Sequence, residues 1–128
     1  MQAWLYDPIV RQPRHPQVEQ IELTDLMYAL SDPARVEIVR RLQRAQRPLT
    51  CNEISLERPK SSMSHHFKAL REAGLIETRI EGKEHLNRLR TAELERRFPG
   101  LVKALLRVIS STARQGRDAT LESGGSRR

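Results

Sequence analysis

The apolar positions of this chain follow the spacing of amphipathic helices over most of its length. Such stripes run through residues 18–30, 33–47, 61–74 and 101–113. The segment from Leu75 to Ile80 is instead rich in β-prone residues, and Glu81-Gly82-Lys83 after it suits a turn, so residues 75–90 are predicted to form a β-hairpin. The pattern therefore predicts a mainly α-helical protein with a small β-hairpin.

The segment from Thr50 to Gly74 carries the signals of two short helices joined by a tight turn. Thr50 and Glu53 form a capping box, which predicts that a helix begins at Cys51. Pro59-Lys60 is interpreted as the turn, because proline disfavours a continuing helix. Ser61 or Ser62 then caps a second helix that Gly74 ends. This arrangement is a helix-turn-helix.

The second of these helices has two different faces. Met63, Phe67 and Leu70 recur at the spacing of one buried stripe. The polar residues opposite are Ser61, Ser62, Ser64, His65, Lys68 and Arg71. Recognition helices enter the major groove with N-terminal residues at base edges and cations on phosphates. We expect the serines and His65 to approach bases, and Lys68 and Arg71 to bind phosphate.

The predicted hairpin follows this helix directly and can act as a wing. It carries the basic residues Arg79, Lys83 and Arg88. Cations on a hairpin next to a recognition helix suit contact with the phosphate backbone or the minor groove. A helix-turn-helix followed by a wing is far more specific for DNA binding than either part alone.

The order of these motifs resembles the winged helix-turn-helix repressors of the arsenical-resistance (ArsR/SmtB) family. The resemblance covers the run LSDPARVEIVRRL, the helix from Cys51 and the run SSMSHHFKALREAGLIETRIEGK. It implies a homodimeric, sequence-specific transcriptional regulator, usually a repressor that an effector releases from an inverted-repeat operator. By this likeness Ser61, Ser62, Ser64 and His65 occupy recognition positions, and His66 stands where the family commonly has histidine. Asn87 fills the usual aromatic position of the wing.

The family's usual metal ligands are absent from the matching positions. Cys51 is the single cysteine, and residues 101–113 contain no His, Asp, Glu or Cys. Zinc and arsenic sites need three or four such ligands, so we expect no metal and no cofactor. The signal that the protein senses is not encoded in a recognisable pattern.

The histidines are not expected to bind a metal. The side chains of His65 and His66 diverge because the two residues are adjacent on a helix. His66 is expected in a hydrogen-bonded packing role, and His15 and His85 are expected to be solvated.

Cys51 leaves two interpretations open. In the first turn of a helix, free N–H groups can lower a thiol pKa, which would permit a redox-sensing repressor. The alternative is a half-buried structural thiol.

No HExxH, P-loop or GxSxG motif is present, so catalysis is not expected. A second alternative is a winged-helix module that binds another protein through its apolar helices.

The composition agrees with a DNA-binding protein. The 128 residues carry a formal charge of +7, which favours a polyanionic partner. We expect an extended N-terminal arm over residues 1–17, one domain over 18–113 and a disordered basic tail over 114–128. The stripes of 18–30 and 101–113 are wide enough to predict dimerisation through the N- and C-terminal helices. No apolar run reaches membrane length and no signal peptide is evident, so a cytoplasmic protein is expected.

Overall fold

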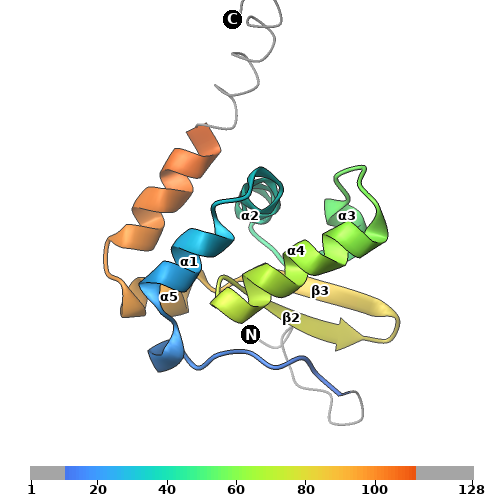
Figure 1. Ribbon diagram of the computed structural model, residues 1–128, viewed down its shortest axis with the longest axis horizontal. Helices are drawn as coiled ribbons and strands as arrows, with labels where there is room; N and C mark the ends of the chain where they lie inside the picture. The colour runs from blue at the N-terminus through green and yellow to red at the C-terminus, as the bar shows by residue number, and fades with distance from the viewer. Residues whose placement is uncertain (1–10, 112–128) are drawn as a thin grey trace, which may run out of the picture.

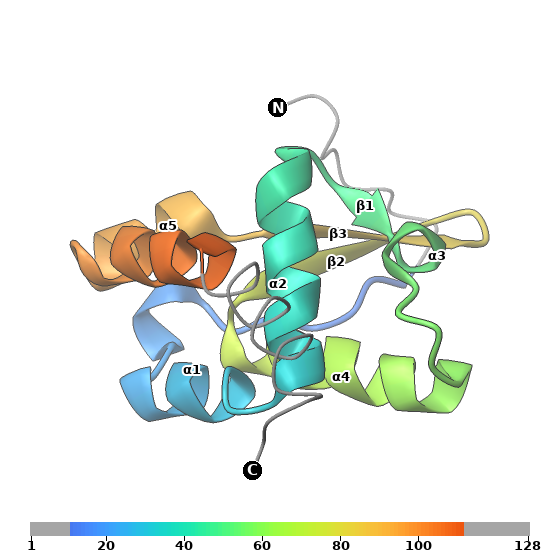
Figure 2. The same cartoon turned by 90° about the horizontal axis from the view of Figure 1, so that it is seen from above.

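The structure is a computed structural model and describes residues 11–111. Helices pack around one small sheet, and α2 lies across the centre of the molecule (Figures 1 and 2). The elements are the 3-10 helix η2 (Val18–Gln20), α1 (Leu23–Ala29), α2 (Pro33–Ala45), β1 (Leu49–Thr50), α3 (Cys51–Ile54), α4 (Lys60–Ala73), β2 (Ile76–Glu81), β3 (Glu84–Leu89), α5 (Thr91–Arg97) and a last helix over residues 101–111. The first ten residues of the predicted arm and the predicted tail lie outside the described residues.

The predicted hairpin is confirmed. Within residues 11–111 the strands form one antiparallel sheet in the order β1-β3-β2, with Thr78 opposite Asn87. Gly82 sits in the turn at φ 61°, in the left-handed region that glycine adopts without strain. The result is a mainly helical protein with a small sheet, which is the architecture of a winged helix-turn-helix.

The helix-turn-helix is formed by α3 and α4. The capping box before α3 is present, since the Glu53 amide donates to the Thr50 hydroxyl over 3.1 Å and the Glu53 carboxylate accepts from the Thr50 amide over 2.8 Å. The predicted start of α4 is wrong. Pro59 is the N-cap residue and Lys60 is already helical, because the Pro59 carbonyl accepts the first helical hydrogen bond, from the Met63 amide over 3.0 Å. The hydroxyls of Ser61 and Ser62 are therefore not used as caps.

The predicted continuous helix from Val18 is also wrong. The chain makes a short 3-10 turn, extends through Ile21 and starts α1 only at Leu23. Ile21 is almost fully buried against the end of α4, where Gly74 closes the helix at φ 93°. A Cβ atom on Gly74 would come within 2.7 Å of the Ile21 side chain. Tertiary packing of one apolar side chain therefore overrides the local helical pattern.

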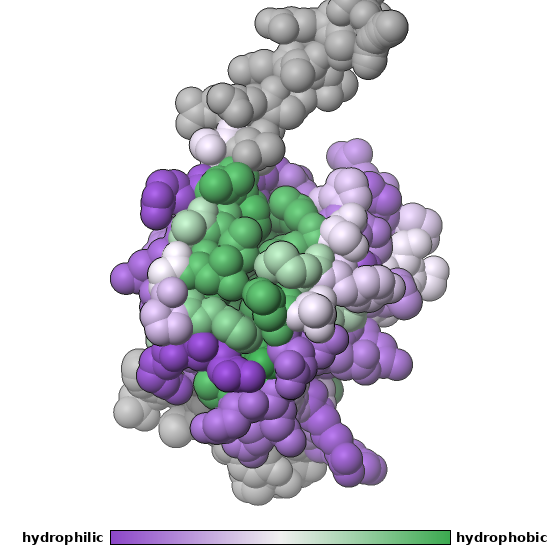
Figure 3. Space-filling view, turned by 60° about the vertical axis from the view of Figure 1, so that its left-hand side comes forward, coloured by the Kyte–Doolittle hydropathy of each residue, from purple (hydrophilic) through white to green (hydrophobic). Residues whose placement is uncertain are grey.

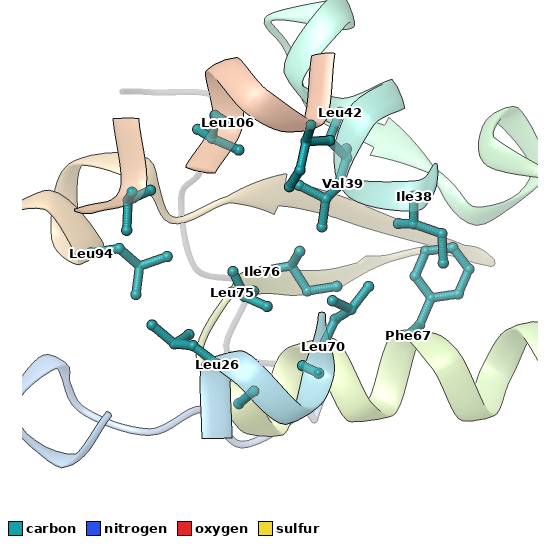
Figure 4. Close-up of a cluster of buried hydrophobic side chains, with 14 of the residues drawn as sticks. Leu26, Ile38, Val39, Leu42, Phe67, Leu70, Leu75, Ile76, Leu94 and Leu106 are labelled. Carbon is teal, nitrogen blue, oxygen red and sulfur yellow. The ribbon is translucent and has the colours of Figure 1, made fainter. Parts of the chain in front are cut away.

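The core lies between α2, α4 and the sheet, and it fixes the orientation of α4. Figure 4 shows Phe67 reaching toward Ile38 of α2, and Leu70 lying toward Ile76 of β2. The predicted stripes of α2 and α4 are buried as expected, with Ile38 and Leu70 at 0% exposure. None of the helices in the described part of the chain has the length and apolar character needed to cross a membrane.

One apolar face of the molecule remains open. Leu23 and Met27 on α1 are 46% and 41% exposed, and Val108 on the last helix is 57% exposed. Figure 3 shows a broad apolar area over this side of the molecule. Large side chains exposed together on two helices are unusual for a surface that stays in water.

The arm residues 11–17 are extended and lie along the outer edge of β2 (Figure 1). The Gln12 side chain donates to the Ile80 carbonyl over 3.1 Å and accepts from the Ile80 amide over 2.8 Å. The Thr78 amide donates to His15 Nε2 over 2.9 Å. His15 is half-buried, so the expectation that it is solvated is wrong, whereas His85 is exposed as expected.

Candidate DNA interface

The outer face of α4 presents the side chains that a recognition helix needs. Ser61, Ser62, Ser64, His65 and Lys68 are all exposed. The three serine hydroxyls have no hydrogen-bond partner among residues 11–111, and Lys68 Nζ is held only loosely, 4.0 Å from the Glu72 carboxylate. Because the buried stripe fixes the helix rotation, these groups point away from the core and are free to bind an external partner.

A cavity of about 390 Å³ separates α3 and the start of α4 from the hairpin. Three of the residues that the sequence predicted for DNA binding meet here, namely Ser64 and Arg71 from α4 and Lys83 from the hairpin turn. The lining also includes Arg58, Lys60 and His85, which the sequence analysis did not select. Glu84 is the one carboxylate in the described lining. The cavity is therefore strongly cationic.

Arg58 and Lys60 have a signal in the sequence that could have been used. Arg58 and Lys60 flank the turn proline, and a turn before a recognition helix lies at the same end of the helix as its base-reading residues. His85 lies directly behind the hairpin turn, but its direction depends on strand register. That register is set by the pairing of Ile80 with His85, which the sequence alone does not give.

A buried polar network forms the base of the cavity around Asn87, which is fully buried. The Thr78 hydroxyl donates to the Asn87 side-chain oxygen over 2.7 Å. The Asn87 amide donates to the Leu49 carbonyl over 3.2 Å and lies 3.4 Å from Cys51 Sγ. Asn87 thus joins β1, β2 and α3, and holds the hairpin against the helix-turn-helix.

The thiol of Cys51 is half-buried in this network. Burial raises its pKa, and the opposing effects of the Asn87 amide and Arg71 do not compensate. This direction is opposite to the lowering that the redox-sensing interpretation of Cys51 needs, and the half-buried thiol is the arrangement of the other interpretation. In residues 11–111 no three His, Cys, Asp or Glu side chains gather where they could hold a metal ion.

Arg79 and Arg88 do not join the other predicted DNA contacts. Side chains alternate along a strand, so Arg79 points away from the face on which Thr78 lines the cavity. It is buried, with its Nε 3.9 Å from the Glu81 carboxylate. Arg88 lies on the same face as Arg79, which is the rear face of the hairpin, turned away from the cavity. There it donates to Glu77 over 2.8 Å and to Glu93 over 2.7 Å. The Arg88 guanidinium is thus hydrogen-bonded within the hairpin and its neighbour α5, whereas the buried Arg79 Nε has no hydrogen-bond partner among residues 11–111.

His66 faces inward and connects α4 to α2. Arg35 Nη1 lies 3.3 Å from His66 Nδ1, and because arginine only donates, Nδ1 is the acceptor in this hydrogen bond. Burial, together with the positive charge of Arg35, lowers the pKa of His66 despite the nearby Asp32. The hydrogen-bonded packing role predicted for His66 is confirmed.

Comparisons with known proteins agree on one kind of protein. A family model described as a helix-turn-helix domain matches residues 30–79. An uncharacterized HTH-type transcriptional regulator of Bacillus subtilis, YceK, is 37% identical over 79 residues, which cover 60% of this chain and 79% of the relative.

Solved structures give the same result. An ArsR-like transcriptional regulator from Rhodococcus is 25% identical, with a TM-score of 0.51 over 83% of this chain and 94% of the other. A crystal structure of an ArsR family transcriptional regulator shares the fold at 20% identity, with a TM-score of 0.52 over 88% of this chain and all of the other. These relatives are all named as transcriptional regulators. The chain therefore belongs to the ArsR family of winged helix-turn-helix, DNA-binding transcriptional regulators.

Proposed function

We propose that this protein is a homodimeric, cytoplasmic repressor that binds an inverted-repeat operator in double-stranded DNA. In this proposal Ser61, Ser62, Ser64 and His65 approach base edges in the major groove, while Lys68, Arg71 and Lys83 bind phosphates. Arg58, Lys60 and His85 extend the phosphate-binding surface. Arg79 and Arg88 lie on the rear face of the hairpin and do not contact DNA in this proposal. They stabilise the hairpin that carries Lys83.

The observation that carries this proposal is the row of exposed polar side chains on α4. Three serines and His65 stand exposed at the N-terminal half of the helix, directly beside the cationic cavity. A merely solvated helix face would not need to lie against a cavity with so many cations. In a recognition helix, short hydroxyl side chains contact base edges and the cations around them contact phosphates.

The cavity between α4 and the hairpin suits a sugar-phosphate strand. Its cations come from three separate segments, the α3–α4 turn, α4 and the hairpin, so a chain of phosphates can contact all three at once. The half-buried position of Arg71 at the inner wall reduces the freedom of its side chain before DNA arrives.

The exposed apolar face supports the homodimer. Leu23, Met27 and Val108 lie on α1 and the last helix, and Figure 1 shows both helices on the other side of the molecule from α3 and the start of α4. Two copies joined across this face by a two-fold axis would place two recognition helices in successive major grooves, about 34 Å apart. The raised pKa of Cys51 gives no support to the redox-sensing alternative.

Fluorescence anisotropy with DNA from upstream of the encoding gene, compared with a scrambled duplex across a salt series, tests this function. We expect the wild type to prefer the native fragment. His65→Ala should lose about 1–3 kcal/mol of that preference. Lys68→Ala should weaken binding to both duplexes, whereas Lys103→Ala, an exposed lysine on the last helix, is the matched control and should bind as the wild type does.

Two results would contradict the proposal. If His65→Ala and Lys68→Ala both left affinity for the native fragment unchanged, α4 would not be the recognition helix. Equal and steeply salt-sensitive binding of the wild type to both duplexes would favour a protein-interaction module that has only a basic surface. Analytical ultracentrifugation of Met27→Asp, which should be monomeric if the apolar face joins two copies, tests the dimer separately.

A further inference from the structure

The arm contains a three-residue repeat. Residues 11–16 read Arg-Gln-Pro-Arg-His-Pro, so arginine, a hydrogen-bonding side chain and proline each occur twice at a spacing of three. A polyproline II helix has three residues per turn, and prolines favour it. Gln17, at φ −66° and ψ 155°, lies in that region of backbone conformation. The repeat therefore gives the arm three distinct faces.

The hydrogen-bonding face is attached to β2. Gln12 contacts both backbone groups of Ile80, and His15 accepts from Thr78, which is nearer the start of the strand. The arm thus runs antiparallel to β2, and its beginning lies toward the hairpin turn. Arg90 fixes the other end by donating to the Pro16 carbonyl over 2.9 Å. Side chains of the arm satisfy the backbone groups that a neighbouring strand would otherwise bind.

The arginine face is consequently turned outward. Arg11 and Arg14 are exposed, and neither forms an ion pair with another residue in the range 11–111. The hairpin beside them has few cations to offer. Lys83 at its turn is flanked by Glu81 and Glu84.

The remaining hairpin arginines are occupied on its rear face. Arg79 lies next to Glu81, and Arg88 pairs with Glu77 and Glu93. The wing itself is therefore close to neutral, and the attached arm supplies the free positive charge along its edge.

We propose that the attached arm is part of the DNA-binding surface, in which Arg11 and Arg14 bind backbone phosphates beside the wing. This inference rests on the DNA-binding function proposed above. The arm is held in place before DNA arrives, so its two cations act as a fixed pair and lose less freedom on binding than a loose tail would. Gln12 and His15 are the positioning residues.

The test uses the full-length chain and a salt series on the native fragment and on the scrambled duplex. Removing two phosphate contacts should lower the slope of log affinity against log salt by about 1.8 per bound protomer. We expect Arg11→Gln with Arg14→Gln to show this decrease on both duplexes. Arg44→Gln with Arg96→Gln removes the same charge from exposed sites on α2 and α5 and should leave the slope unchanged.

A second variant tests the attachment itself. Gln12→Ala with His15→Ala keeps both arginines but removes the bonds to β2, and we expect weaker binding than in the wild type. Slopes for Arg11→Gln with Arg14→Gln that equal the control would overturn the proposal. Wild-type binding by Gln12→Ala with His15→Ala would also overturn it, because the arginines would then act as a free tail. Failure of the wild type to prefer the native fragment would instead overturn the proposed function.

Discussion

The outer face of α4 and the rear face of the hairpin are both rich in polar and charged residues, yet they differ in how those residues are used. Ser61, Ser62 and Ser64 have no hydrogen-bond partner among residues 11–111. On the hairpin, Arg88 is paired with carboxylates of β2 and α5, and Arg79 is buried with its Nε 3.9 Å from the Glu81 carboxylate. Residue type alone suggested DNA contact for both faces. The presence or absence of an internal partner separates a surface ready for a ligand from one that stabilises the fold.

The largest expected effect concerns the polar residue that is most completely enclosed. Asn87→Ala should destabilise the protein by about 3 kcal/mol, because it leaves the Thr78 hydroxyl and the Leu49 carbonyl without their buried partner. Ser64→Ala on the open face should change stability by less than about 0.5 kcal/mol. Urea unfolding of the two variants measures the contrast. Equal midpoints would mean that the Asn87 network contributes nothing to the fold.

The next effect concerns Arg88. Its guanidinium is partly exposed and shared by Glu77 and Glu93, so Arg88→Gln should cost about 1 kcal/mol. Burial opposes ionisation of Glu93, but hydrogen bonding to Arg88 outweighs it and lowers the pKa of Glu93 below 4.5. This stabilisation is present above pH 4.5 and is lost as the pH falls through the lowered pKa.

Stability against pH therefore distinguishes the two roles considered for Arg88. Thermal unfolding from neutral to acidic pH should show a smaller acid-dependent loss in Arg88→Gln than in the wild type. The salt slope for DNA should stay at the wild-type value. A reduced slope with unchanged stability would place Arg88 on DNA after all.

Lys83 provides the opposite case within the same hairpin. It is exposed at the turn and forms no ion pair with any residue of the described range. Lys83→Gln should leave the urea midpoint unchanged and reduce the salt slope by about 0.9, the value for one phosphate. A change in the unfolding midpoint without a change in slope would group Lys83 with Arg88.

The smallest effect concerns His15. Burial lowers its pKa from 6.5, so the neutral ring that accepts from Thr78 is favoured in the folded protein. The neighbouring charges are Glu77, which raises this pKa, and Arg90, Arg71 and Arg88, which lower it. The attachment is present above pH 6.5 and weakens as the pH falls through the lowered pKa. The protection of the Thr78 amide against hydrogen exchange, corrected for the intrinsic pH dependence of the exchange rate, should therefore decrease as the pH falls through this pKa. His15→Gln should remove this decrease.

Much of this fold was accessible from local patterns in the sequence. The capping box at Thr50, the glycine at the end of α4 and the stripe through Phe67 are signals within a few residues of one another, and each is confirmed. What escaped prediction depends on contacts between distant segments. The burial of Ile21 under Gly74 and the pairing of Gln12 with Ile80 link positions more than fifty residues apart.

The candidate site divides in the same way. The exposed residues of α4 follow from helix periodicity, whereas the placement of Arg79 and Arg88 follows from strand register and from Glu93 on α5. The raised pKa of Cys51 could not be inferred from its place in the helix, because it follows from burial of the thiol beside Asn87 of the hairpin.

The position of the arm along the chain has a consequence for biosynthesis. Residues 11–17 leave the ribosome long before β2 is made, so the segment that covers the strand edge exists before the edge does. Uncovered edges pair with other chains and start aggregation, most readily while a protein is still folding. A nascent chain of this protein can cover its hairpin as soon as the hairpin forms, without waiting for a second molecule or for DNA.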